Sequence, residues 1–354
     1  MPGLTTPDIH REAEFWVGPE ASAAPVRATV VIPCYFGEAT LLRAAQSALG
    51  QSLHDIEVIL VDDGSLDDSW SIIADLLQRD GRVRALRHET NLGKSAAMNR
   101  AMALARGAWL AVLDADDWYH PERLCRLISL GEERQADLVA DNQFLFDAAA
   151  AQVVGTAWTA ASSAWQLEFD DFLDGSDAYQ SFNLGMLKPI LRVDFMRAAG
   201  LGYEESARQG EDFFHLLQFF LAHGRAVVSD TPYYFYTQPF GSVSRQWSHS
   251  GRTRYDFQNA YDITLRYLQN ADLTSRQRRR LSARYGRLKT LEFYFRAKDA
   301  FSHRDWATVI GHLTSHPFAL GYLLRRLYGR LLPTSNNLER FAERARRRRE
   351  DANH

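Results

Sequence analysis

The sequence has little cysteine and no long apolar run. Its only cysteines are Cys34 and Cys125, and neither lies in a C-x-x-C pattern. This argues against a disulfide framework and against a zinc site, so both thiols are expected to be packing residues. No run of about 18 apolar residues occurs, and the N-terminus lacks the basic and apolar regions of a secretory signal. We therefore expect a cytoplasmic protein without a membrane-spanning segment.

Two nucleotide-binding fingerprints are missing as well. The chain contains neither G-x-G-x-x-G nor G-x-x-x-x-G-K-[ST], which counts against a dinucleotide-dependent enzyme and a P-loop ATPase. Apolar material is abundant, because 46% of the 354 residues are hydrophobic, enough for a large core in one domain or in two. The net charge of −3 hides an uneven distribution, since arginine dominates the C-terminal end.

Short apolar runs typical of buried strands alternate with segments of helical spacing. The runs cover residues 29–32, 56–61, 83–86, 109–113, 138–140 and 226–229. Residues 41–49, for example, repeat their apolar side chains at helical spacing. This alternation predicts an α/β fold with a mostly parallel, Rossmann-like sheet and helices on both faces. Ligands of such sheets bind at the carboxyl ends of the strands.

Three carboxylates follow the fourth apolar run, at Asp114, Asp116 and Asp117. Like charges this close perturb one another's ionisation unless solvent, a cation or a hydrogen-bonding group stabilises them. Mg²⁺ or Mn²⁺ typically takes one or two carboxylates and completes its shell with water and phosphates. The cluster therefore predicts a divalent metal site, and the alternative is a solvated acidic loop that caps the next helix.

Other strand ends carry groups suited to a nucleotide. Tyr35 offers a flat face for stacking a base, and Asp62 and Asp63 can accept hydrogen bonds from imide, amine or ribose groups. Alternatively, Asp63 belongs to a simple turn and Tyr35 is an aromatic at the rim. Lys94 lies where a loop opens into a helix, and backbone N–H groups there could hold phosphate oxygens together with its ammonium.

The motifs Val-Ile-Pro-Cys-Tyr, Val-Asp-Asp-Gly-Ser, Asn-Leu-Gly-Lys, Asp-Ala-Asp-Asp and Gly-Glu-Asp occur in this order. Together they resemble the inverting family 2 glycosyltransferases with the GT-A fold, over about residues 27–250. The resemblance implies that Tyr35 stacks on uracil and that Asp63 binds its imide. It places Asp114 near the ribose and makes Asp116 the main metal ligand, with Asp114 beside it.

The resemblance also assigns the remaining site residues. Asp212, next to Glu211, matches the catalytic base, although two acids are also favoured at a helix N-terminus by the helix dipole. Pro33 and Glu38 complete the predicted donor-binding loop. Many relatives carry an Arg and a His after the Tyr-rich strand, and this chain departs from that pattern. The basic contact to the diphosphate would come instead from Arg245 or His249, or be absent.

These assignments predict a metal-dependent inverting glycosyltransferase. It would move a sugar from a nucleotide sugar to a saccharide acceptor, with a UDP-sugar as the expected donor and Mn²⁺ or Mg²⁺ as cofactor. A polyprenyl-diphosphate-linked precursor of an exopolysaccharide or surface polysaccharide is the expected acceptor. The alternatives are a non-catalytic nucleotide- or carbohydrate-binding relative and a sugar-1-phosphate nucleotidyltransferase, although the latter normally shows a Gly-rich, Arg-containing loop after its first strand.

We divide the chain into three regions. Residues 1–26 show no periodicity and are interpreted as a loosely attached leader. Residues 27–250 form the predicted catalytic domain, with nucleotide-sugar binding in 27–143 and acceptor binding and the base in 144–250. Residues 251–354 are predicted to be a helical extension.

The aromatic residues Trp158, Trp165 and Tyr179 could form a platform for the acceptor sugar, or belong to a core. Near the C-terminus, residues 316–332 place leucines on one helical face with arginines at its edges, and 344–349 are strongly cationic. Such a helix can lie on the inner face of the cytoplasmic membrane, or it can pack on the catalytic domain. Nucleic-acid binding is not expected, because aromatic and basic residues do not interleave.

Overall fold

The computed structural model describes residues 10–12, 15–18, 25–159, 164–176, 183–238, 257–315 and 321. The chain divides into two compact units. Unit 1 comprises residues 1–168, 187–205 and 214–250, and unit 2 comprises 169–186, 206–213 and 251–354. Unit 2 thus includes two short segments, 169–186 and 206–213, that belong to the predicted catalytic domain of residues 27–250. None of the described helices is both long enough and apolar enough to span a membrane.

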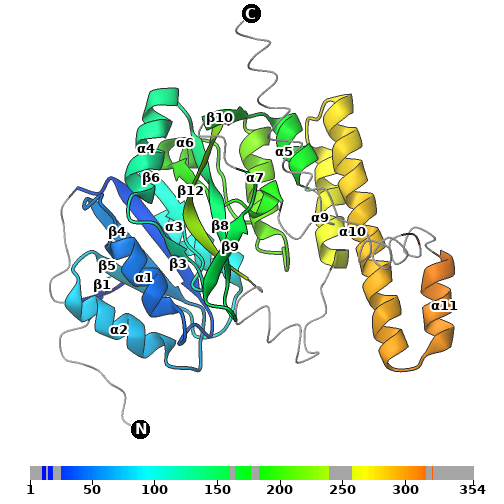
Figure 1. The fold of residues 1–354 in the computed structure, drawn as a ribbon, viewed down its shortest axis with the longest axis horizontal. Coiled ribbons are helices and arrows are strands. Elements are labelled where there is room, and N and C mark those ends of the chain that lie inside the picture. The colour runs from blue at the N-terminus through cyan, green and yellow to red at the C-terminus, as the bar shows by residue number, and fades with distance from the viewer. Residues whose placement is uncertain are drawn as a thin grey trace, which may run out of the picture. The chain divides into compact units, whose positions relative to one another are not determined.

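The described part of unit 1 contains a mixed sheet of twelve strands (Figure 1). Its strands are β1 His10–Glu12, β2 Phe15–Val17, β3 Ala28–Cys34, β4 Ile56–Asp62, β5 Val83–Arg87, β6 Trp109–Val112, β7 Trp118–Tyr119, β8 Leu138–Asp147, β9 Gln152–Thr156, β10 Ala164–Leu167, β11 Ile190–Arg192 and β12 Ala226–Gln238. Their order is β1-β2-β5-β4-β3-β6-β11-β8-β12-β10, with β7 on β12 and β9 on β8.

The parallel strands β5, β4, β3 and β6 form the centre of the predicted fold. Every residue of β4 and of β6 is buried, as expected for strands covered on both faces. The predicted apolar runs all coincide with strands, so the mostly parallel sheet is confirmed. The short strands β10 and β11, which pair antiparallel with their neighbours, were not predicted.

Helices cover both faces of this central sheet (Figure 1). They are α1 Leu41–Leu49, α2 Ser69–Arg79, α3 Lys94–Leu104, α4 Arg123–Arg134 and α6 Val193–Ala198. On one face, Ala97 and Met98 of α3 pack with Val31, Ile59 and Val112 of the strands in one apolar cluster. On the other face, α1 and α2 lie against the same strands and bury Leu41 and Ile73, among others.

The N-terminal segment differs from the expected loose leader at residues 15–17. There β2 pairs antiparallel with β5, and Phe15 and Val17 are buried in the apolar cluster that α3 covers. The guanidinium carbon of Arg84 lies 3.6 Å from the centre of the Phe15 ring. Local composition does not predict the burial of Phe15 and Val17, because it depends on pairing of β2 with β5, which is distant in the sequence.

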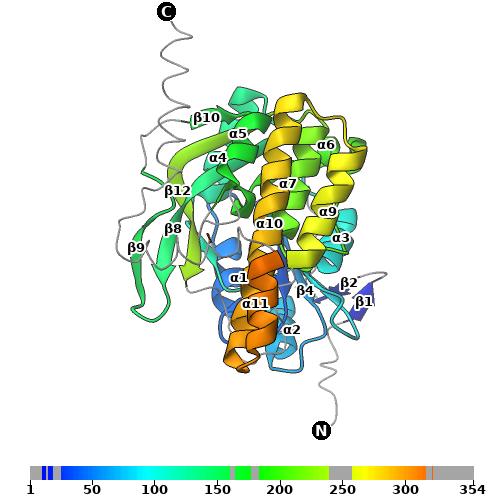
Figure 2. The same cartoon turned by 90° about the vertical axis from the view of Figure 1, so that its right-hand side faces the viewer.

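Unit 2 is helical in its described residues, which confirms the predicted helical C-terminal region. It contains α5 Phe169–Gly175, the 3₁₀ turn η1 Leu184–Met186, α9 Phe257–Asn270, α10 Ser275–Ser302 and α11 Trp306–Ser315. Figure 2 shows α11 lying against the C-terminal end of α10. α10 starts with a capping box, in which Thr274 and Gln277 satisfy each other's backbone N–H groups. The helix α7, Glu211–Leu221, begins in unit 2 and continues into unit 1.

Candidate functional site

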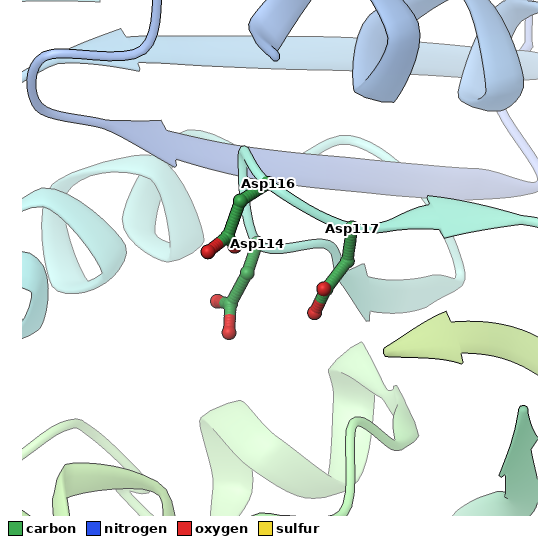
Figure 3. A group of neighbouring side chains, drawn as sticks. All are labelled: Asp114, Asp116 and Asp117. Carbon is green, nitrogen blue, oxygen red and sulfur yellow. The ribbon is translucent and has the colours of Figure 1, made fainter. Parts of the chain in front are cut away.

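The three carboxylates of the acidic cluster lie on the loop between β6 and β7, at the carboxyl end of the parallel strands (Figure 3). One oxygen from each of Asp114, Asp116 and Asp117 lies within 4.8 Å of the others. The predicted position of the cluster after a buried strand is therefore confirmed. The three side chains differ sharply in what they contact.

Asp117 is tied to β12. Its Oδ2 accepts a hydrogen bond from the Tyr234 hydroxyl at 2.6 Å, and its Oδ1 accepts one from the Thr237 N–H at 2.8 Å. The side chain is buried, and this burial, followed by the charges of Asp116 and Asp114, raises the pKa of its carboxyl well above the ordinary value. With both oxygens already occupied, Asp117 fixes the loop to the sheet.

Asp114 is held by two ammonium groups. Its Oδ1 lies 2.9 Å from Nζ of Lys94, and its Oδ2 lies 2.6 Å from Nζ of Lys188. Burial raises the pKa of the Asp114 carboxyl, but the charges of Lys188 and Lys94 lower it by more, so the net pKa lies below its ordinary value. Asp114 is therefore a fixed anion with a defined orientation.

Asp116 is the carboxylate whose charge is not compensated in this way. Among the described residues, no side chain donates a hydrogen bond to it or forms an ion pair with it. Burial and the neighbouring charge of Asp114 raise the pKa of its carboxyl. A divalent cation next to Asp116, with an oxygen of Asp114 nearby, would remove this repulsion, and oxygen ligands are those that Mg²⁺ and Mn²⁺ prefer. The residues present thus fit the predicted metal.

The backbone of Asp116 is also fixed. Its carbonyl accepts hydrogen bonds from the Thr237 hydroxyl and from Nη2 of Arg43, the latter at 2.7 Å. The guanidinium of Arg43 lies 4.0 Å from the centre of the Trp118 ring, which follows the acidic cluster directly. These contacts hold the backbone of Asp116 in place and leave its carboxylate unused.

A buried ion pair positions residues that bind the acidic cluster. Arg123, at the start of α4, forms a salt bridge of 2.8 Å with Asp141 of β8, and both residues are buried. The Arg123 guanidinium lies over the rings of Tyr119 and Tyr234 and donates a hydrogen bond to the Lys188 carbonyl. One guanidinium therefore positions both Tyr234, which binds Asp117, and Lys188, which binds Asp114.

Asp63, predicted to bind the base, is buried and already accepts three hydrogen bonds. Its Oδ1 lies 2.7 Å from Nδ1 of His88 and accepts the Leu92 N–H, while its Oδ2 accepts the Gly93 N–H. The carboxylate therefore shapes the loop that leads into Lys94 at the start of α3. Binding of a base by Asp63 stays a prediction.

The other predicted donor-binding residues lie at the end of β3 and on the loop that follows it. Pro33 and Tyr35 are partly exposed. The rings of Tyr35 and Phe36 contact each other edge to face, with 4.6 Å between the ring centres. Glu38 is exposed, and its carboxylate accepts the Asp68 N–H at 3.3 Å. Part of the Tyr35 side chain thus remains accessible for stacking.

The predicted base lies in unit 2. Glu211 and Asp212 form the first turn of α7 and are both partly buried. Asp116 belongs to unit 1, so the pairing of Asp212 with the acidic cluster across a sugar stays a prediction. Arg245 and His249 lie outside the described residues, as do Tyr179 and most of 316–354.

Of the two alternatives for Trp158 and Trp165, an acceptor platform or a core, the structure supports the core. Both side chains are buried, and both indole N–H groups donate to Oδ1 of Asp230 at 3.0 Å. A buried tryptophan needs such an acceptor for its N–H. These residues therefore belong to the core beneath β12.

Five of the residues that organise this site were not predicted: Arg43, Arg123, Lys188, Tyr234 and Thr237. For Lys188 a signal existed, because it interrupts the apolar run Met-Leu-Lys-Pro-Ile-Leu, and a charge in such a run must find a partner. Lysine is also rare here. Only four lysines occur in the chain, and two of them contact Asp114.

Comparison with known proteins gives a consistent result. Residues 29–167 match the family model described as Glycosyl transferase family 2. Two similar proteins come from Rhizobium meliloti (strain 1021). The succinoglycan biosynthesis protein ExoU is 30% identical over 312 residues, covering 84% of this chain and 86% of ExoU. The succinoglycan biosynthesis protein ExoO is 33% identical over 220 residues, but the match spans only 61% of this chain and 62% of ExoO.

A third relative has a more specific description. The UDP-Glc:alpha-D-GlcNAc-diphosphoundecaprenol beta-1,3-glucosyltransferase WfaP of Escherichia coli is 29% identical over 117 residues. That match covers 33% of this chain and 46% of WfaP.

Solved structures show the same fold. The S. aureus protein TarS, in a complex of its residues 1–349 with UDP-GlcNAc, matches with a TM-score of 0.59 and 19% identity, over 82% of this chain and 80% of that one. The mannosyltransferase PcManGT from Pyrobaculum calidifontis, in complex with GDP-Man and Mn²⁺, matches with a TM-score of 0.53 and 13% identity, over 85% and 82%. The predicted GT-A fold is therefore confirmed.

Proposed function

The chain belongs to glycosyl transferase family 2, and on that premise we propose that it is a metal-dependent inverting hexosyltransferase that uses a UDP-sugar. The observation that carries the proposal is the contrast within the acidic cluster. Asp114 forms ion pairs with two lysines, whereas Asp116 beside it forms no ion pair among the described residues. The pKa of the Asp116 carboxyl is raised even though the charges of Lys188 and Lys94 act to lower it. This is an arrangement suited to a cation that is bound together with a phosphorylated ligand.

The donor would lie at the carboxyl ends of β3, β4 and β6. Tyr35 would stack on uracil, with Asp63 beside it. Pro33 at the end of β3 and Glu38 on the following loop would line the same site, with Lys94 close to the phosphates. The complex of the fold neighbour TarS with UDP-GlcNAc supports a uridine nucleotide as donor. If Arg245 contacts the diphosphate, it would do so from the segment after β12.

Asp116 and Asp114 would hold Mn²⁺ or Mg²⁺. A divalent cation at this position would offset the negative charge that develops on the departing nucleoside diphosphate, in place of a general acid. Lys94 and Lys188 keep Asp114 ionised and oriented for this role. The presence of Mn²⁺ in the PcManGT complex supports the choice of metal.

Asp212 would act as the general base. An acceptor hydroxyl must lose its proton as it attacks the anomeric carbon, and a carboxylate within hydrogen-bonding distance can accept that proton. A single in-line displacement then inverts the anomeric centre. Glu211 precedes Asp212 in the same helical turn and would assist by its charge.

The acceptor would be a saccharide carried on a polyprenyl diphosphate, at the cytoplasmic face of the membrane. The descriptions of ExoO and ExoU as succinoglycan biosynthesis proteins support exopolysaccharide synthesis. The description of WfaP, which acts on a diphosphoundecaprenol-linked sugar, supports a lipid-linked acceptor.

The test is release of UDP from a panel of UDP-sugars, measured with EDTA, Mg²⁺ or Mn²⁺, for the parent chain and for Asp116→Asn. We expect hydrolysis or transfer with one donor, dependent on the divalent cation, and a loss of about 100-fold or more in the variant. Binding of UDP without turnover under any condition would instead indicate a non-catalytic relative. Incorporation of a sugar 1-phosphate into a nucleotide sugar would indicate a nucleotidyltransferase.

A further inference from the structure

The end of the α10–α11 hairpin exposes three large apolar side chains. Phe301 is 58% exposed, Trp306 is 56% exposed and Ile310 is 61% exposed. The rings of Phe301 and Trp306 contact each other edge to face at 5.1 Å, and Ile310 lies one helical turn beyond Trp306. We call these three residues the hairpin patch. Phe301 lies at the end of α10, and Trp306 and Ile310 lie on α11. Figure 2 shows α11 folding back along α10.

The local structure holds the patch in place. Asp305 accepts the Thr308 N–H at 3.1 Å and so caps the first turn of α11. Hydrogen bonds from the side chain and from the backbone N–H of Thr308 lower the pKa of the Asp305 carboxyl. Trp306 is therefore presented on the first turn of a capped helix. Adjacent apolar side chains with this exposure normally mark an interaction surface.

The sequence that follows the patch is strongly basic. Nine of the 41 basic residues and four of the 44 acidic residues lie in 316–354, so this segment carries +5 while the rest of the chain carries −8. The apolar spacing also continues, because Leu320, Leu324, Leu327 and Leu331 repeat the alternation of three and four residues that begins at Trp306 and Ile310. Apolar side chains and positive charge thus occur together at this end of the chain.

We propose that the hairpin patch is a docking surface for an anionic lipid bilayer. Trp306, Phe301 and Ile310 enter the interfacial region, where tryptophan is favoured because its ring is apolar and its N–H can meet the headgroups. The arginines beyond residue 316 draw the chain to anionic headgroups. The inference goes beyond the proposed reaction and does not depend on it, although a surface-bound enzyme could reach a lipid-linked acceptor directly.

A second copy of the chain is the other occupant to consider. Stable protein interfaces bury about 800 Å² on each partner, which is more than three side chains supply. Self-association would also bring the two basic segments together, whereas an anionic bilayer neutralises them. Size and charge therefore both favour the bilayer.

The test is sedimentation of the full chain with vesicles of phosphatidylcholine, with and without phosphatidylglycerol. We expect binding to the vesicles that contain phosphatidylglycerol, weakened by high salt. The double variant Trp306→Glu, Ile310→Glu should bind about tenfold or more weakly, because it places charge where apolar contact is needed. The matched control is Val153→Glu, Val154→Glu, which alters two exposed valines on β9 and should bind like the parent.

Three results would overturn the proposal. They are failure of the parent chain to bind anionic vesicles, equal binding by the patch variant and the parent, and a patch-dependent dimer in light scattering without lipid. UDP release from a UDP-sugar, measured without vesicles, should be the same for the patch variant and the parent. That assay shows that the variant is folded, and it separates failure of this proposal from failure of the proposed function.

Discussion

Nζ of Lys188 lies 2.6 Å from Oδ2 of Asp114, joining the segment just before β11 to the acidic loop after β6. Only 5% of the Lys188 side chain is exposed, whereas Asp114 is 21% exposed. Lys94 approaches the other oxygen of Asp114 from α3. Three separate elements of the sheet edge thus meet at one carboxylate, which leaves Asp116 as the group that needs a cation.

Replacing Lys188 should weaken this assembly. Lys188→Met removes a buried ammonium and leaves Asp114 with Lys94 alone, so we expect a loss of about 1–3 kcal/mol in the free energy of unfolding. We also expect weaker binding of UDP in the presence of Mn²⁺, because Asp114 loses its fixed orientation. Urea denaturation and calorimetric titration measure the two effects. Lys289→Met, on α10, is the control and should match the parent in both.

Asp116→Asn should have the opposite effect on stability in the metal-free protein. Burial and the charge of Asp114 raise the pKa of the Asp116 carboxyl, so at pH values above its ordinary 3.8 the folded state binds more protons than the unfolded state. The free energy of unfolding therefore falls as pH rises through the folded-state pKa. Urea denaturation in EDTA at a series of pH values should show the variant to be more stable than the parent above that range.

Asp117→Asn provides the contrast. Asp117 accepts hydrogen bonds from Tyr234 and Thr237, and an asparagine would turn a donor toward one of them. We expect a loss of about 1–2 kcal/mol in the free energy of unfolding. If both asparagine variants were destabilised alike, the distinction between an anchored and an uncompensated carboxylate would be wrong.

A contact within unit 2 should matter for the predicted base. The guanidinium carbon of Arg284 on α10 lies 3.5 Å from the centre of the Phe213 ring, next to Asp212, and Nη1 of Arg284 donates to the Ser176 carbonyl at 2.7 Å. Phe213 also stacks on Phe172, with 5.3 Å between the ring centres. Arg284→Met should therefore lower kcat by about tenfold or more, because small misplacements of a catalytic group are costly, without changing the affinity for UDP.

Asp212→Asn tests the base itself. It should lower kcat more than Arg284→Met does, again with unchanged binding of UDP, because the donor residues lie on other elements. Arg284→Lys should recover part of the lost activity, since it keeps a cation over the Phe213 ring. Full activity of Asp212→Asn would remove Asp212 from the mechanism and leave the metal site unaffected.

The two cysteines should differ in reactivity. Burial raises the pKa of the Cys34 thiol to about 12, whereas Cys125 is exposed on α4, contrary to the expectation that both are packing residues. The thiolate is the reactive form, so Cys34 should resist iodoacetamide in the folded protein at pH 8. Mass spectrometry should find one modified cysteine in the folded chain and two after denaturation. Rapid modification of Cys34 would contradict the packing around β3.

Local patterns in the sequence predicted the parts of the fold that are locally determined. The strands β3, β4 and β6 are mainly apolar because they are buried on both faces, and the acidic loop follows β6. By contrast, β11 has only three residues, and its place between β6 and β8 depends on pairing with distant strands. The position of Lys188 beside Asp114 follows from that pairing.

Side-chain roles were harder to predict than the sheet. The sequence around Trp158 and Trp165 fits an exposed platform as well as a core. Their shared hydrogen-bond acceptor, Asp230, decides for the core, and it is 65 or more residues away in the chain. Asp63 was correctly placed at a strand end, but its three partners come from the segment around His88 and Gly93. Long-range partners of this kind leave no local pattern.

The most direct test of the central claim is titration of the chain with Mn²⁺ in the presence of UDP, followed by electron paramagnetic resonance of free Mn²⁺. The account predicts one bound ion per chain, with affinity reduced about 100-fold in Asp116→Asn and unchanged in Asp212→Asn. Equal affinity in the parent chain and in Asp116→Asn would show that the acidic cluster does not hold the metal.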